Sequence, residues 1–217
     1  MARDTQAMRI ASGPSWSLEL GDDPFLSAAL WIRDATGIVV EADDVPPPLN
    51  VPPPSSHVLD GEDLDGVGGD WLDWWRALLA ARLAQRHNPP PGGDFGEEWK
   101  QWAVTNQARW AAVGSIGDEF AGLAHAPALQ RACRELGRAA HGARTTSKIQ
   151  HDRAMGYGLL VDEVAATHHV DRNTLCGTVI VTPTGGGWWR LIEPGFVLAS
   201  NDAPHQEIVR AALTPAP

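Results

Sequence analysis

Hydrophobic side chains recur at helical spacing most densely between Asp70 and Arg86. Seven apolar residues there cover about half the circumference of a helix, and alanines together with Asp73 line the opposite side. An apolar arc of that width is typical of a helix that packs in a protein core. We therefore predict a core helix beginning at Asp70, with Trp75 near the centre of its buried arc. The apolar positions are Trp71, Leu72, Trp74, Trp75, Leu78, Leu79 and Leu83.

Two arginines inside the same arc allow a second interpretation of this helix. Arg82 and Arg86 follow Trp75 after two and three helical turns, and a guanidinium there must reach solvent or stack on an aromatic ring. Trp and Arg are the commonest anchors of protein interfaces, and Trp74 lies at the edge of the arc. The competing hypothesis is a protein-docking face that comprises Trp71, Trp74, Arg82 and Arg86.

The pattern before residue 45 predicts β structure. Residues 15–20 alternate apolar and polar side chains, as a half-buried strand does. Residues 29–33 and 37–41 flank the sequence Asp-Ala-Thr-Gly, whose turn chemistry fits a β-hairpin. A helix from Asp23 to Arg33 is the competing assignment for the same stretch.

Helical periodicity returns after residue 125, and the last third of the chain changes to strands. Apolar residues at spacings of three and four predict helices over 126–140 and 147–168. Asp202 stands where a carboxylate would cap a short final helix that ends at Leu213. Runs of β-branched residues, separated by turns, predict a three-stranded antiparallel meander over 176–183, 188–192 and 196–200.

Two proline-rich stretches, 45–56 and 88–93, interrupt these elements. Proline fixes φ and lacks an N–H donor, so neither stretch can form a helix or a central strand. We interpret both as connectors, and the second ends the tryptophan helix. The whole pattern predicts an α+β fold, in which a helical middle segment packs with an N-terminal strand/hairpin region and with the C-terminal meander plus the final short helix. We expect a single domain over residues 1–217.

Composition and charge narrow the possible partners. A hydrophobic content of 43% is enough for a substantial core. The net charge is -10, and the whole acidic excess lies in residues 1–100. Because an acidic surface repels phosphate groups, nucleic acid is a disfavoured partner.

The sequence also gives expectations for the cellular location, the state of the cysteines and the cofactor content. The chain has no uninterrupted run of about 18 apolar residues and begins without the apolar segment of a secretory signal. We therefore expect no membrane association and a cytoplasmic location. Cys133 and Cys176 lack the spacing of a metal site and are expected to be reduced, buried thiols. We expect no cofactor, because neither glycine-rich loop has a phosphate-binding spacing. We expect no metal, because the acidic stretch 60–66 lacks the ligand spacing of a calcium loop.

One polar cluster carries candidate chemistry. His168, His169 and Asp171 could hold a metal or transfer a proton, which would make the protein a metal-assisted or acid/base enzyme. Adjacent histidines on a helix point about 100° apart, however, and a histidine at a helix C-terminus is stabilised by the macrodipole without any catalytic role. Capping of the helix end is therefore the competing interpretation.

The same region resembles a helix-turn-helix motif over residues 162–175. Ala165 stands at the tight contact between the two helices, Val170 follows the turn, and the second helix would open with Arg172, Asn173 and Thr174. The resemblance implies a DNA-binding regulator whose second helix enters the major groove. Gly177 and the β-branched run that follows would cut that helix short.

The sequence thus leaves three hypotheses. The preferred one is a non-catalytic cytosolic protein-interaction or assembly module that binds another protein through its Trp/Arg-rich helical face. A DNA-binding regulator with a degenerate helix-turn-helix is the first alternative. An enzyme centred on His168, His169 and Asp171 is the second alternative.

Overall fold

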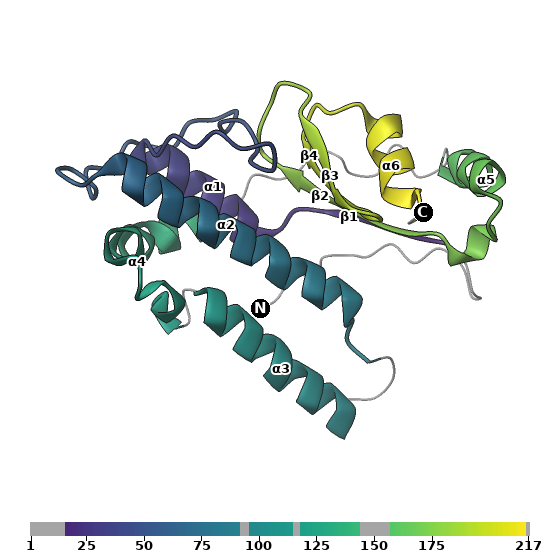
Figure 1. The fold of residues 1–217 in the computed structure, drawn as a ribbon, viewed down its shortest axis with the longest axis horizontal. Helices are drawn as coiled ribbons and strands as arrows, with labels where there is room; N and C mark the ends of the chain where they lie inside the picture. Colours follow the sequence, from purple (N-terminus) through teal and green to yellow (C-terminus); the bar gives the residue numbers. More distant parts are fainter. Residues whose placement is uncertain (1–15, 92–95, 115–117, 144–156, 216–217) are drawn as a thin grey trace. The chain divides into compact units, whose positions relative to one another are not determined.

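The structure is a computed structural model that describes residues 16–91, 96–114, 118–143 and 157–215. These residues form six α-helices and a four-stranded mixed sheet, with a helical middle and C-terminal strands followed by a final helix, which confirms the α+β class. The chain divides into two compact units (Figure 1). Unit 1 comprises residues up to 23, 42–51 and the chain from 145, and unit 2 comprises 24–41 and 52–144. The single domain over 1–217 stays a prediction.

Unit 1 contains the sheet. Its strands are β1 (Ser17–Gly21), β2 (Cys176–Thr182), β3 (Trp189–Glu193) and β4 (Phe196–Ser200), in the order β1-β2-β4-β3. β1 and β4 both pair parallel with β2, and β3 pairs antiparallel with β4. The three predicted C-terminal strands are present, but the antiparallel meander is wrong, because β4 lies between β2 and β3.

The side chains of the strands explain this order. β4 is buried along its whole length, and β2 is buried from Gly177 onward. Strands covered on both faces carry continuous apolar runs and occupy the centre of a sheet. β3 carries the exposed Arg190 and Leu191 and has a register shift between Leu191 and Glu193. Charge and a bulge are typical of an edge strand, since both discourage pairing with another chain.

Two helices complete unit 1. α5 (Tyr157–His168) contacts α6 (His205–Leu213), and α6 packs on β2 and β4 (Figure 1). A Cβ atom at Gly177 would lie 2.5 Å from the carbonyl oxygen of Ala212, so this glycine permits the close approach of helix and strand. Residues 157–168 of the predicted helix over 147–168 are confirmed, whereas 147–156 lie outside the described residues. The core between helices and sheet includes Val161, Val164, Val179, Val197, Ile208 and Leu213.

The predicted cap of the final helix is wrong. α6 begins after Pro204 and has no side-chain cap. The carboxylate of Asp202 instead accepts the backbone N–H groups of Gly186 and Gly187, at 3.0 and 3.1 Å, in the loop between β2 and β3. Gly186 and Gly187 both have positive φ, a conformation that glycine adopts without strain, and their two N–H groups bond to this one carboxylate.

Unit 2 is helical. Its helices are α1 (Pro24–Thr36), α2 (Leu64–His87), α3 (Glu97–Val113) and α4 (Pro127–Gly142), with a short 3₁₀ turn, η2 (Ala121–Leu123). α2 contacts both α1 and α3, and α1 contacts α4 (Figure 1). The predicted helix over 126–140 is confirmed as α4, and the tryptophan helix ends at His87 as predicted but begins at Leu64, before Asp70.

The predicted β-hairpin over 29–41 is wrong, and the competing helix is right. α1 buries Leu26, Ala29, Leu30 and Arg33, which recur at spacings of three and four and therefore share one side of a helix. Gly37 follows the helix with φ 70°, and the N–H of Ile38 bonds to the carbonyl of Arg33 at 3.1 Å. This is the hydrogen bond of a Schellman C-cap, so the glycine ends a helix where a hairpin turn was predicted.

The first proline-rich connector contains no helix and none of the strands of the sheet, as predicted, yet it also contributes to the core. Val45 and Leu49 are buried, and Leu49 forms an isolated antiparallel bridge with Thr184. The second connector follows the C-cap residue Asn88, and its residues 92 and 93 lie outside the described part of the chain. Among the helices in the described ranges, none combines the length and the apolar character needed to cross a membrane.

Candidate functional site

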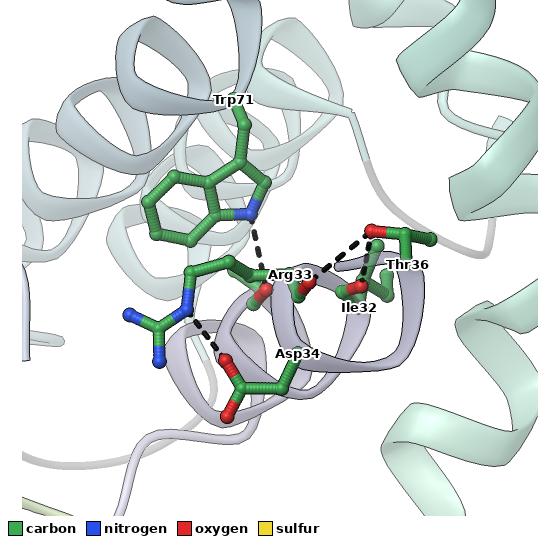
Figure 2. Close-up of polar contacts among 6 residues, drawn as sticks. Ile32, Arg33, Asp34, Thr36 and Trp71 are labelled. Atoms are coloured by element: carbon green, nitrogen blue, oxygen red, sulfur yellow. Dashed lines mark hydrogen bonds and ion pairs between the residues drawn. The ribbon is translucent and has the colours of Figure 1, made fainter. Parts of the chain in front are cut away.

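Trp71 is a core residue of unit 2. It is fully buried, and its Nε1 donates to the carbonyl oxygen of Ala29 in α1 at 3.1 Å (Figure 2). Trp75, also fully buried, stacks on it with ring centroids 5.6 Å apart and an interplanar angle of 11°. The prediction that Trp75 is core is therefore confirmed. Trp71, which was predicted to contact a partner, is inaccessible in this structure.

A buried cation that was not predicted from the sequence, Arg33, lies over the ring of Trp71. Arg33 is 4% exposed, and its guanidinium carbon lies 5.7 Å from the centroid of the indole. Its Nε donates to Asp34 Oδ1 at 2.6 Å, so the buried charge is balanced by the next residue (Figure 2). The signal was available: in a helix over 24–36, Arg33 shares the face of Leu26 and Leu30, whereas in the predicted hairpin it does not.

Trp74 joins two helices. It is 5% exposed, and its Nε1 donates to the carbonyl oxygen of Val113, in the last turn of α3, at 2.8 Å. Its ring meets Phe120 edge-on, with centroids 6.2 Å apart. The helical wheel places Trp74 at the edge of the apolar arc, and the structure shows that α3 covers that edge.

A second indole makes the same contact in the opposite direction. Nε1 of Trp102 in α3 donates to the carbonyl oxygen of Asn88, the C-cap residue of α2, at 2.8 Å. The last carbonyls of a helix have no partner within the helix. Trp74 and Trp102 therefore each satisfy a terminal carbonyl of the other helix, and they hold α2 and α3 together as an antiparallel hairpin (Figure 1).

The predicted docking face is not assembled as one exposed surface. Trp71 and Trp74 lie in the core, while Arg82 and Arg86 are half-buried on the last turns of α2. Arg82 Nη1 donates to Gln85 Oε1 at 3.2 Å. Of the four predicted residues, only the arginines keep accessible surface.

α3 presents accessible apolar surface that the sequence analysis did not consider. None of its 17 residues is buried. Val104 is 61% exposed, and Trp99, Trp102 and Trp110 are half-buried. Between Lys100 and the end of the helix, Arg109 is the only charged residue. The signal in the sequence was a helical stretch almost without charge after the second proline-rich connector.

His168, His169 and Asp171 form a helix end. His169 has φ 54°, its N–H bonds to the carbonyl of Ala166, and the N–H of Val170 bonds to the carbonyl of Ala165 at 3.1 Å. These two bonds define a Schellman motif. All three candidate residues are exposed, and within the described part of the chain no group of three His, Cys, Asp or Glu side chains is placed to hold a metal.

The second helix of the helix-turn-helix resemblance is absent from residues 162–175, all of which the structure describes. Arg172–Thr174 form only a 3₁₀ turn, η4, and β2 begins two residues later. Asp171 Oδ1 accepts the N–H of Asn173 at 2.9 Å, and Arg172 pairs with Asp162 at 2.7 Å. These contacts hold the segment as a turn between helix and strand.

Polar side chains also gather where β2 and β4 end. Ligands of open α/β sheets commonly bind at such an edge. Here the groups bind one another: the hydroxyls of Thr182 and Thr184 lie 2.9 Å apart, and Ser200 Oγ donates to Asp202 Oδ1 at 2.7 Å. The hydrogen bonds from Ser200 and then from the Gly187 N–H lower the pKa of Asp202. The cluster therefore fixes the loop between β2 and β3.

Both cysteines are free thiols, as predicted, although only one is buried. Burial raises the pKa of Cys133 far above its usual range. Cys176 is exposed at the first position of β2, which corrects the expectation that both are buried.

Comparison of the chain with protein-family models, with curated proteins and with solved structures gave no match.

Proposed function

We propose that this protein is a non-catalytic protein-interaction module whose docking surface is the open side of α3. The observation that carries the proposal is that none of the 17 residues of α3 is buried and that Val104 on its outer side is 61% exposed. Large apolar side chains left accessible on a folded chain commonly mark an interaction site. A partner that covers α3 would bury apolar area that the chain alone leaves in contact with water.

The chemistry of the exposed stripe favours a protein partner. Gln101, Val104, Ala108 and Ala111 are exposed and recur at spacings of three and four, so they share one side of the helix. A solvent-facing helix ordinarily carries charge on its outer side, and this stripe carries none. Interface centres are depleted of charged residues in the same way, and an apolar helix side fits the groove or helical surface of another protein.

Arg82 and Arg86, which the sequence placed in a docking face, form the rim of the proposed docking surface on α3. Asn88 meets Trp102, so the last turns of α2, which carry Arg82 and Arg86, lie at the same end of the hairpin as the first turns of α3. Half-exposed arginines beside tryptophans are typical of interface edges. The proposal includes another protein as the partner and the cytoplasm as the location.

Site-specific photocrosslinking tests the proposal. The photoreactive residue p-benzoylphenylalanine is placed at Val104 of the full chain, and crosslinking is triggered in the cells that produce it. A control position is Glu207, which is exposed on α6 in unit 1. We expect a covalent adduct of defined mass from position 104 and none from position 207.

The second part of the test uses a charged variant. With the photoreactive residue at Ala108, Val104→Asp should abolish the adduct without changing the thermal unfolding midpoint, because Val104 is 61% exposed. An adduct of twice the chain mass would identify a second copy as the partner. Failure to obtain any adduct from positions 101, 104 and 108 would reject α3 as the docking surface.

A further inference from the structure

The two ends of α3 are attached to unit 2 very differently. At its C-terminal end, Trp74 donates to Val113, and the ring of Trp110 stacks on Phe25 of α1 with centroids 4.3 Å apart. A Cβ atom at Gly122 would lie 2.4 Å from the carbonyl oxygen of Ala112, which shows how closely η2 approaches this end. The C-terminal third of α3 is therefore fixed by a hydrogen bond, an aromatic stack and direct backbone packing.

The N-terminal half has weaker support. The hydrogen bond from Trp102 to Asn88 joins it to α2, the rings of Trp99 and Trp102 contact each other within α3, and the nearby pair of Lys100 and Glu97, at 3.3 Å, is exposed. Exposed ion pairs contribute little to stability. Gly96, the N-cap residue, supplies no side-chain hydrogen bond to the first turn.

These contacts decide how this segment unfolds. Regions with little buried apolar surface open locally, with free energies well below that of global unfolding. Each of the other five α-helices in the described chain buries at least four residues, whereas α3 buries none.

We propose that the N-terminal half of α3, residues 97–106, is a strap that detaches from α2 by local unfolding, with the Trp102–Asn88 hydrogen bond as its latch. The anchored end at Val113 stays in place while the strap opens. Opening exposes the indole of Trp102 and releases the C-cap carbonyl of α2. Gln101 and Val104 of the proposed docking surface lie within the strap, but the inference concerns the protein without a partner and does not rest on the docking proposal.

Hydrogen exchange of the full chain tests the strap. We expect amides 101–106 to exchange at least about tenfold faster than amides 74–79 of α2, with rates that low concentrations of denaturant leave unchanged. Exchange of both segments at one rate, with the same steep denaturant dependence, would show that α3 opens only by global unfolding and would overturn the inference.

A matched pair of variants tests the latch. Trp102→Phe keeps an aromatic ring but removes the N–H donor, and it should raise exchange of amides 101–106 roughly two- to tenfold, the size expected for one hydrogen bond, while amides 74–79 are unchanged. Trp74→Phe removes the equivalent donor at the anchored end and should affect amides 110–113 and α2 together. If Trp102→Phe leaves amides 101–106 unchanged, Trp102 is not the latch and the proposal is wrong.

Discussion

The indole of Trp74 caps the last turn of α3 by donating to the carbonyl of Val113 at 2.8 Å. A side chain of α2 thus satisfies a terminal carbonyl of α3. At the other end of the pair, Trp102 of α3 donates to the C-cap carbonyl of α2. Buried indoles usually find such a partner for their N–H group. Trp74 is consequently a structural residue, and its value to the fold lies in joining two helices.

We expect Trp74→Ala and Trp75→Ala to destabilise the protein by similar amounts, on the order of 3–5 kcal/mol each. Trp75 is fully buried and Trp74 is 5% exposed, so both substitutions leave a large cavity. Such losses are a large part of a typical unfolding free energy of about 5–15 kcal/mol. Chemical denaturation measures both values. A loss for Trp74→Ala of less than about 1 kcal/mol would contradict the burial of this side chain.

Trp102→Ala is the natural control for those two variants. Trp102 is half-buried on a helix that buries no residue, so the loss should be clearly smaller than for Trp75→Ala. The same denaturation series provides this comparison.

His169→Gly should stabilise the protein by roughly 0.5–1 kcal/mol, because glycine adopts the left-handed conformation without the steric penalty of a side chain. His169 has φ 54° at the end of α5 and is exposed, so no side-chain packing is lost. His168→Gly, one residue earlier and still helical, should instead destabilise by about the same amount. Thermal unfolding of the two variants measures the difference, and a loss of stability in both would contradict the capping role.

The sequence indicates that Gly37 adopts a positive φ, but it does not show whether this glycine belongs to a hairpin turn or to the end of a helix. Hairpin turns and helix C-caps both use glycine with positive φ. The outcome was decided by tertiary contacts of Leu26, Leu30 and Ile32, which pack α1 in the core of unit 2. Local turn chemistry carries no information about that packing.

The strand order and the role of Trp74 were hidden for a related reason. Strands that are neighbours along the chain usually pair, yet β4 is apolar enough to be covered on both faces and takes the central place. The helical wheel places Trp75 inside the apolar arc and Trp74 at its edge, but it cannot show that α3 covers this edge and buries Trp74 as well. Periodicity within one element predicts which side is apolar, and only the assembled fold determines what covers it.

Asp202 should make the stability of unit 1 depend on pH in acid. Its pKa is lowered from 3.8 in the folded protein, first by the hydrogen bond from Ser200 and then by the Gly187 N–H. A carboxyl group with a depressed folded pKa contributes stability that is complete above its unfolded pKa, and that is lost as the pH falls through the folded value. Asp202→Asn should therefore be less stable than the wild type at pH 6, and the gap should narrow below about pH 4. Denaturant titrations at several pH values test this, and a gap that stays constant into acid would contradict it.

Gly177 and Gly158 should respond in opposite ways to the same substitution. The Cβ of Gly177→Ala would lie 2.5 Å from the carbonyl oxygen of Ala212, so β2 or α6 must move. Overpacking of this kind destabilises by about 1–3 kcal/mol.

At Gly158, within α5, no described atom outside its chain neighbours and the backbone of its own helix lies within 4 Å of an added Cβ. Alanine there lowers the entropy of the unfolded chain and favours the helix, which should stabilise the protein by roughly 0.5–1 kcal/mol. Thermal unfolding of the two variants at one pH provides the comparison. If Gly177→Ala were as stable as the wild type, the close packing of α6 on β2 would be wrong, and with it the account of why a glycine stands in the otherwise β-branched centre of the sheet.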